Sequence, residues 1–159
     1  MQETYDYVLI DCPPNIYMMT QNALVVSDYY VIPTIPEFLS TIGIRILNDK
    51  VGVIRQNVSG VANMAGASGV AVAAFGGIVL VKVRIGGNRV TRQHFGRMVE
   101  MQSDFPGECF DDYTTELIGY SEAAQLRLPI WLANTPNARK AARKLEYENI
   151  TNEILRRFP

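Results

Sequence analysis

Apolar residues recur along this 159-residue chain in short continuous runs, separated by longer stretches with helical spacing. Three runs, at residues 8–10, 29–35 and 77–83, are almost wholly apolar, and a weaker strand is predicted over residues 109–117. Continuous apolar runs are typical of strands buried on both faces of a parallel sheet, because a half-exposed strand alternates apolar and polar positions. The pattern therefore predicts four strands, the first of them very near the start of the chain.

The stretches between these runs predict helices at residues 18–26, 38–57 and 91–102. A last helix is predicted from Thr135 as its N-cap and Pro136 as its first residue. Its apolar stripe consists of Ala138, Ala142, Leu145, Ile150, Ile154 and Phe158. Strands alternating with helices imply a single α/β domain over residues 1–159, with a parallel sheet, right-handed crossovers and flanking helices.

Composition excludes several classes of protein. With 48% hydrophobic and 19% charged residues, the chain has the balance of one globular domain. Its 15 Lys and Arg against 16 Asp and Glu give a net charge of -1, so any binding to nucleic acid must come from a local patch. Cys12 and Cys109 are far apart, which favours free thiols in a reducing, cytoplasmic setting over a disulfide framework.

No charged residue occurs between Arg55 and Lys82, a run long enough to span a bilayer. Its many Gly, Ala and Ser residues and its Asn63 argue against a single apolar helix. We expect the tail of a helix, a connection of small residues and then a buried strand, with no membrane association; close packing of small residues at an interface is an alternative.

The first predicted strand ends in Asp11, within the sequence YDYVLIDCPPN. A carboxylate at the carboxyl end of a buried parallel strand is the form of a Walker B element, which holds magnesium. Asp also ends many strands for a simpler reason, because its side chain caps the backbone that follows. The motif alone leaves both interpretations open.

Residues 5–47 resemble the middle of ParA-type chromosome and plasmid partition ATPases, which are relatives of the MinD family. Three matched segments carry the resemblance in order: Asp11-Cys12-Pro13-Pro14, Thr20-Gln21-Asn22-Ala23-Leu24 and Pro33-Thr34-Ile35-Pro36-Glu37-Phe38. The similarity continues more thinly through GGIVLV, SEAAQLRLPI and NEILRRF, so that it extends over nearly the whole chain.

The resemblance implies roles for individual residues. It makes Asp11 the catalytic carboxylate and the Mg2+ ligand, and it places Pro36 and Glu37 near the nucleotide. The switch-like turn would consist of Cys12, Pro13, Pro14 and Asn15. The family's cofactors are ATP and Mg2+, its activity is ATP-dependent segregation of DNA or other cargo, and its fold is a P-loop NTPase fold.

The glycine-rich phosphate loop of the family, which ends in Gly-Lys-Thr, does not occur in these 159 residues. The glycine pair in RIGGNRVT, residues 84–91, lacks that ending and reads as a turn. We therefore interpret the chain as the carboxyl-terminal half of such an ATPase. Because magnesium needs substrate oxygens to complete its shell, Asp11 is expected to bind it only with a nucleotide and the missing half. ATP hydrolysis by this chain alone is not expected.

Two further departures from the family's sequence affect recognition of the nucleotide base. The resemblance places a Thr-Met-x-Asp segment where this chain has residues 81–84, and a Pro-Arg-Asn segment where it has residues 115–117.

Loss of the phosphate-loop strand would also leave residues 8–10 without a neighbour, and open strand edges invite pairing with another chain. We expect a homo-oligomer, pairing with the missing amino-terminal half, or a rearrangement that places residues 8–10 beside residues 29–35.

Basic residues gather in the last predicted helix. Arg139, Lys140, Arg143 and Lys144 recur at helical neighbour spacings, and the resemblance implies non-specific DNA contacts there and an adaptor protein of the ParB type. A solvated helix face explains the same residues, since Glu146, Glu148 and Glu153 share the helix. His94 is predicted to be an exposed helix residue, and Trp131 is predicted to lie in the core or at an interface.

Two classes of function remain open. One is half of a partition ATPase, and the other is a nucleotide-independent module for oligomerisation or for binding DNA or protein, derived from the same fold. A flavodoxin-like or receiver-like domain is a third alternative, but it leaves the Pro13-Pro14 pair and the later matches unexplained.

Overall fold

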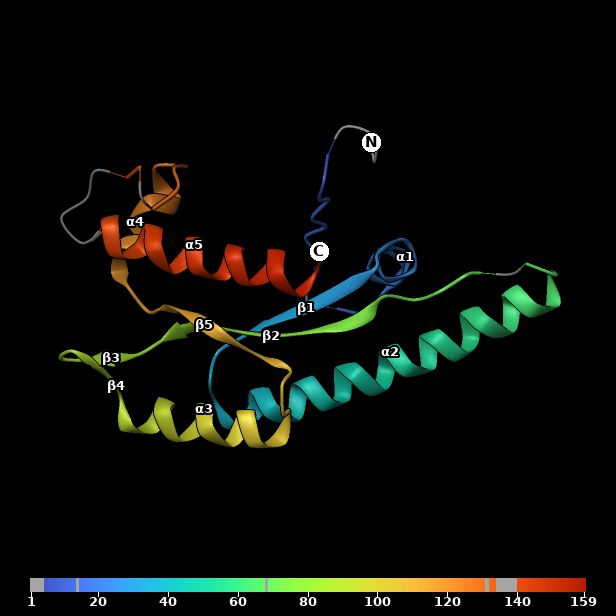
Figure 1. The fold of residues 1–159 in the computed structure, drawn as a ribbon, viewed down its shortest axis with the longest axis horizontal. Helices are drawn as coiled ribbons and strands as arrows, with labels where there is room; N and C mark the ends of the chain where they lie inside the picture. The colour runs from blue at the N-terminus through green and yellow to red at the C-terminus, as the bar shows by residue number, and fades with distance from the viewer. Residues whose placement is uncertain (1–4, 14, 68, 131, 134–139) are drawn as a thin grey trace. The chain divides into compact units, whose positions relative to one another are not determined.

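A computed structural model describes residues 5–13, 15–67, 69–130, 132–133 and 140–159. The elements alternate between helix and strand along most of the chain, as Figure 1 shows. In order they are α1 (Met18–Val26), β1 (Tyr29–Thr34), α2 (Phe38–Met64), β2 (Ala74–Val83), β3 (Ile85–Gly86), β4 (Arg89–Val90), α3 (Arg92–Asp104), β5 (Cys109–Thr115), α4 (Ile118–Gln125) and α5 (Lys140–Arg157).

The chain forms two compact units. The first unit consists of residues 1–30 and 45–75, and the second consists of residues 31–44 and 76–159. Each unit has a hydrophobic cluster of its own. The expectation of a single domain over residues 1–159 stays a prediction.

The first unit packs α1 and most of α2 around a small core. Leu24 of α1 and Val51 and Ile54 of α2 are buried there. The segment leading to β2 completes the core with Val72 and Ala73, and the backbone N–H of Ala73 donates to the Leu24 carbonyl at 2.8 Å. Residues 24 and 73 therefore meet through both packing and a hydrogen bond, although they lie far apart in the sequence.

A three-stranded sheet of order β1-β2-β5 is the centre of the second unit, and its strands run parallel. The partners of β2 and β5 are Ile78 with Cys109, Leu80 with Tyr113 and Val83 with Thr115, with shifts in register between them. Pro33 lies in β1, an edge strand of this sheet, which is where a residue without an N–H is tolerated. The α/β class and the parallel sheet predicted from the sequence are confirmed.

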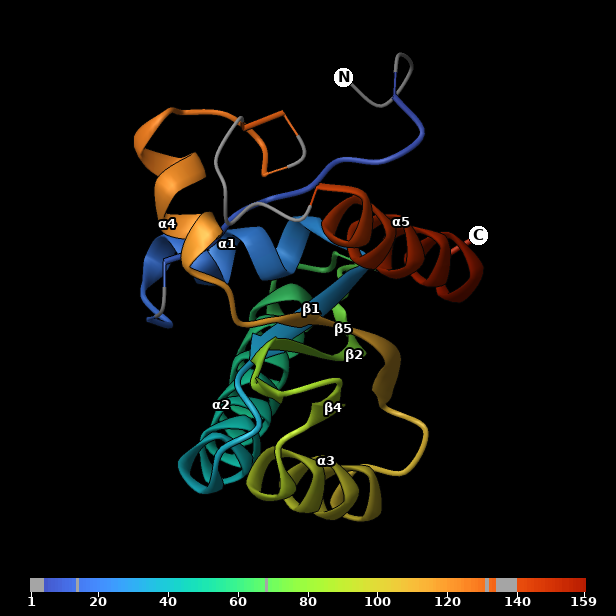
Figure 2. The same ribbon diagram turned by 90° about the vertical axis from the view of Figure 1, so that its left-hand side faces the viewer.

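Helices cover both faces of this sheet. Figures 1 and 2 show α5 on one face and α3 on the other. The α5 face packs Ile150 against Val79 and Phe110, with Ile154 and Phe158 beside them. This apolar contact fixes α5 along β5.

Carboxylates from α5 bind the backbone of β5. Glu153 accepts hydrogen bonds from the N–H groups of Asp111, at 3.1 and 3.0 Å, and of Asp112, at 3.2 Å. Two helical turns earlier on α5, Glu146 accepts hydrogen bonds from the Thr115 N–H at 3.2 Å and from the Thr115 hydroxyl at 3.0 Å. Since β5 pairs with β2 through its other edge, these two carboxylates satisfy donors that a free sheet edge would expose.

Residues 8–10 do not form the predicted strand. Residues 7–13 lie in no helix or strand, and Leu9 is 85% exposed. The alternative arrangement, with residues 8–10 beside residues 29–35, is also wrong, because β1 pairs only with β2 among the described residues. A strand needs a neighbour to bond its backbone, and the part of the chain that the structure describes supplies none for residues 8–10.

The remaining predictions are largely confirmed. The helix at residues 18–26 and the strand from residue 29 agree with α1 and β1, and the weak strand at residues 109–117 is β5. The second helix runs to Met64, seven residues beyond its predicted end. The sequence did not predict α4, and the predicted cap at Thr135 and Pro136 lies outside the described residues.

The long uncharged run behaves as expected. It holds the end of α2, a connection of small residues and the start of β2. In the part of the chain that the structure describes, no helix combines the length and apolar character needed to cross a bilayer.

Candidate nucleotide site

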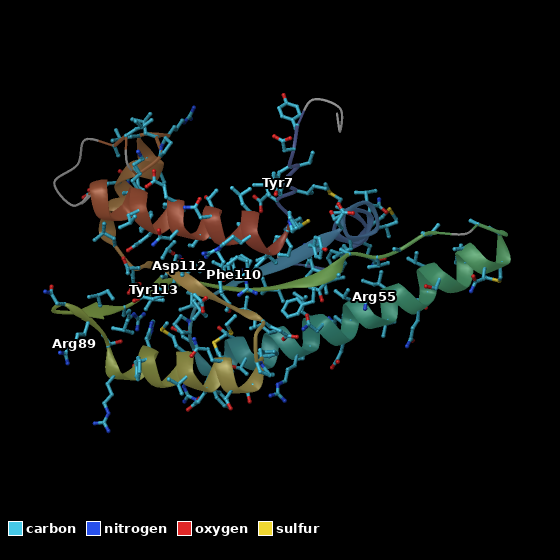
Figure 3. The ribbon with its side chains drawn as sticks, in the orientation of Figure 1. Tyr7, Arg55, Arg89, Phe110, Asp112 and Tyr113 are labelled. Atoms are coloured by element: carbon cyan, nitrogen blue, oxygen red, sulfur yellow. The ribbon has the colours of Figure 1, made fainter. Side chains whose placement is uncertain are left out.

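Asp11, the predicted magnesium ligand, lies on the exposed segment that precedes α1. Its neighbours Val8, Leu9 and Ile10 are also exposed, and Figure 3 shows Tyr7 on the same segment. No strand holds the Asp11 backbone in place. The structure therefore does not give Asp11 the fixed position at the end of a sheet that a Walker B carboxylate has.

The predicted switch turn is tied to the start of α1. The N–H of Asn15 donates to the Pro13 carbonyl at 2.7 Å, and the Thr20 hydroxyl donates to the Asn15 carbonyl at 2.7 Å. Gln21 donates from its side-chain amide to the Ile16 carbonyl at 3.0 Å. Thr20 and Gln21 thus have a structural use, since they bond the turn that leads into the helix. Cys12 is exposed, and Pro14 lies outside the described residues.

Pro36 and Glu37 belong to the second unit, at the turn between β1 and α2. Pro36 is fully buried and Glu37 is exposed. The N–H of Glu37 donates to the Ile35 carbonyl at 2.7 Å, and its carbonyl accepts from the Ser40 N–H at 3.1 Å. Both residues are thereby explained by the turn that begins α2, and their predicted proximity to a nucleotide stays a prediction.

The two departures from the family's base-binding segments meet at the carboxyl ends of β2 and β5. Arg84 Nε donates to Glu116 Oε2 at 2.9 Å. The backbone is joined there as well, because the Glu116 N–H donates to the Val83 carbonyl at 2.8 Å. Lys82, beside this pair, has a φ of 53°, a left-handed conformation that is uncommon for a residue with a side chain. The sequence identified both segments, but not that they contact each other.

His94 is buried, contrary to the prediction of an exposed helix residue. It lies on α3 with 1% of its surface exposed, and its Nδ1 accepts a hydrogen bond from the Arg84 N–H at 3.1 Å. Because Nδ1 is an acceptor, the proton of the neutral ring is on Nε2. Nε2 has no partner among the described residues, and neither has the buried hydroxyl of Thr91. His94 fixes the start of the β3–β4 hairpin to α3.

The described residues do not form a magnesium site by themselves. Within the described ranges, no three His, Cys, Asp or Glu side chains lie together in a way that could hold a metal ion. Asp11 offers one exposed carboxylate, and magnesium usually requires substrate phosphate oxygens in addition to one or two carboxylates. The residues present therefore do not fit a magnesium–nucleotide complex without further ligands.

The predicted DNA-binding residues lie at or before the start of α5. Arg139 is outside the described residues, and Lys140 and Arg143 lie on the helix. Lys144 is exposed and pairs with Glu148, one turn later, at 3.3 Å. The carboxylate of Glu148 therefore offsets the positive charge of Lys144 within the helix itself.

Comparison with known proteins gives a consistent result. A family model described as an AAA domain matches residues 1–63. An uncharacterized protein of Mycobacterium tuberculosis is 30% identical over 157 residues, which is 98% of this chain and 43% of that protein. A ParA family protein of Chlamydia pneumoniae is 30% identical over 156 residues, covering 98% of this chain and 52% of the relative.

The sporulation initiation inhibitor protein Soj of Bacillus subtilis matches a shorter region, with 36% identity over 59 residues, 37% of this chain and 23% of Soj. The chain is similar to proteins of the ParA/MinD family of partition ATPases. It spans about half the length of the mycobacterial and chlamydial relatives that it matches throughout. No solved structure matches it significantly.

Similarity to the ParA/MinD family accounts for the α/β fold and for the motifs at residues 11–14, 20–24 and 33–38. It also implies nucleotide and Mg2+ use in the family. The Arg84–Glu116 pair and the buried His94 are features of this chain that the family motifs did not predict.

Proposed function

We propose that this chain takes part in ATP-dependent segregation of DNA or other cargo, with Asp11 as the magnesium-binding carboxylate of a composite site. The observation that carries the proposal is the match to a ParA family protein over 98% of the chain. The site is composite because the 159 residues contain no Gly-Lys-Thr loop. The phosphate-binding amides and lysine have to come from sequence outside this chain.

The chain alone should then neither bind MgATP tightly nor hydrolyse it. An exposed carboxylate competes with water for magnesium, and hydrolysis also requires groups that stabilise charge on the transferred phosphate. The test is a titration of residues 1–159 with a fluorescent ATP analogue, with and without Mg2+. We expect no saturable signal, and saturable magnesium-dependent binding would contradict the proposal.

A fusion tests the positive half of the proposal. The glycine-rich segment of a ParA-family relative is joined before Tyr5, and ATP turnover is measured. We expect turnover that Asp11→Asn lowers at least about 100-fold, since a metal ligand contributes several kcal/mol to the transition state. Asp6→Asn is the matched control, because Asp6 is an exposed acid of the same segment. Equal effects of the two substitutions would contradict the role of Asp11.

The proposed cargo contacts lie at the start of α5. Arg139, Lys140, Arg143 and Lys144 would bind DNA phosphates without sequence preference, and an adaptor protein of the ParB type would bind elsewhere. Alanine substitution of all four residues should weaken binding to duplex DNA and lower its salt dependence, as measured in a filter-binding assay. Unchanged binding would leave the solvated helix face as the explanation.

A nucleotide-independent oligomeric module is the second candidate. The exposure of Tyr7, Val8, Leu9 and Ile10 favours it, since adjacent apolar residues in an extended segment are suited to pairing with another chain. Sedimentation at about 100 μM should give a dimer or larger species. Leu9→Glu should return it to a monomer, whereas Asp6→Asn should not. A monomer at all concentrations would exclude this candidate.

A further inference from the structure

The charges of this chain are unevenly distributed, although they nearly cancel overall. Residues 50–99 contain no Asp or Glu. The cations of this stretch are Lys50, Arg55, Lys82, Arg84, Arg89, Arg92 and Arg97. Five of the seven fall within residues 82–97, so the end of β2, the β3–β4 hairpin and the beginning of α3 form a local positive patch.

Three of the five cations in residues 82–97 have no ion-pair partner within the described ranges. Arg84 is paired with Glu116 and Arg97 with Glu100, whereas no carboxylate contacts Lys82, Arg89 or Arg92. All three are exposed. Figure 3 shows Arg89 on the hairpin at the outer end of the sheet, pointing away from the strands. Their charge is available to a partner.

The hairpin that carries Arg89 is held in a defined position. Ile85 pairs with Val90 and Gly86 with Arg89, across a two-residue loop in which Gly87 has a φ of 66°. The Thr91 N–H donates to the Arg84 carbonyl at 2.9 Å, and the Arg84 N–H donates to His94 at 3.1 Å. These bonds fix the hairpin to α3, which lowers the entropy cost of binding through it.

An exposed aromatic ring lies close to Arg92, one of the unpaired cations. Phe95 is 60% exposed, and it follows Arg92 by three residues on α3, which places both side chains on one face of the helix. Cations bind the phosphates of nucleic acids, and an exposed ring offers a stacking surface for a base. In a duplex the base faces are covered by their neighbours, so only an unstacked base can use Phe95.

We propose that the basic hairpin surface, consisting of Arg89, Arg92 and Phe95, binds single-stranded nucleic acid. Arg89 and Arg92 bind successive phosphates, and Phe95 stacks on a base between them. This surface shares no residue with those proposed above for nucleotide and for duplex DNA. Its binding therefore requires no ATP.

The test is fluorescence anisotropy of residues 1–159 with labelled oligo(dT) and oligo(U) of about 15 nucleotides, without nucleotide, over a range of salt concentrations. We expect binding to at least one of the two oligomers. Arg89→Ala with Arg92→Ala should weaken binding about tenfold or more at low salt and reduce the salt slope by about 1.4, which is about 0.7 for each phosphate lost. Arg156→Ala is the control, because it removes an exposed cation from α5 and should change neither quantity.

The role of the ring is tested separately. Phe95→Leu keeps an apolar side chain without a stacking face and should weaken binding at least about fivefold with an unchanged salt slope, whereas Phe95→Trp should retain binding. Circular dichroism checks that each variant is folded. The proposal is overturned by equal affinity for a duplex of the same length, by equal competition from polyglutamate, or by an Arg89 and Arg92 double variant that binds normally.

Discussion

The carboxylate of Glu153 on α5 accepts two hydrogen bonds from the backbone N–H of Asp111 on β5, at 3.1 and 3.0 Å. Glu153 is only 3% exposed, and its charge is balanced by Arg157, 2.8 Å away. Arg157 in turn donates to the Cys109 carbonyl at 2.8 Å and lies over the Phe110 ring. A partly buried ion pair within α5 thus connects the last helix to the edge strand, and Figure 3 labels Phe110 on that strand.

Replacement of Glu153 should therefore be costly. Glu153→Ala leaves the Arg157 charge and two backbone N–H groups without their acceptor, and it should lower the free energy of unfolding by about 3 kcal/mol. Chemical denaturation measures the change. Glu148→Ala, which breaks the exposed pair with Lys144, should cost less than about 1 kcal/mol. A similar cost for both would show that the β5 contacts contribute little.

Gly77 is required by close approach of two backbones. It has a φ of 128°, and a Cβ at this position would lie 2.5 Å from the Glu108 carbonyl oxygen. Gly77→Ala should therefore destabilise the protein by about 2 kcal/mol or more, as measured by thermal unfolding.

Gly60 supplies the matched comparison. It lies inside α2, where an added Cβ meets nothing within 4 Å. Gly60→Ala should stabilise the helix by up to about 1 kcal/mol, because Ala has the higher helix propensity. Equal shifts of the unfolding temperature in the same direction for Gly77→Ala and Gly60→Ala would contradict the close backbone approach at Gly77.

His94 should tolerate replacement only by a side chain that keeps an acceptor. His94→Leu leaves the Arg84 N–H without a partner and should lower the free energy of unfolding by about 1–3 kcal/mol. His94→Asn can place its side-chain oxygen near the position of Nδ1 and should lose less. Denaturant titration compares the two variants, and a more stable Leu variant would argue against the importance of this hydrogen bond.

The two thiols should differ in reactivity. Burial raises the pKa of the Cys109 thiol, nearby Glu108 raises it further, and Arg157 opposes both effects. Cys12 is exposed. At pH 8 iodoacetamide should therefore modify Cys12 well before Cys109, as mass spectrometry of the labelled peptides can determine. Rapid labelling of Cys109 in the folded protein would contradict its burial.

The same raised pKa has a consequence for stability. The folded protein holds the Cys109 proton more tightly than the unfolded chain does. The stabilisation is complete below the unfolded pKa of the thiol and is lost as the pH rises through the folded pKa. Cys109→Ser should make stability less sensitive to pH in that alkaline range, as measured by denaturation at several pH values.

The sequence by itself determined most elements and the family resemblance. Local patterns suffice for α1, β1 and the beginning of α2, since apolar spacing and turn residues act over a few positions. The motifs at residues 11–14, 20–24 and 33–38 identified the ParA resemblance, and the comparisons confirm it. Several motif residues then proved to have local structural uses, as Thr20 does at the start of α1.

Only the tertiary structure decided which residues meet across the chain. Residues 8–10 have the composition of a buried strand, but a strand forms only where a neighbour accepts its backbone hydrogen bonds, and no described strand does so. The sequence pattern predicts His94 and Glu153 as surface residues, but packing buries His94 against Arg84, just after β2, and Glu153 against β5. These contacts join residues 10 to 42 positions apart, a separation at which local pattern carries no information about partners.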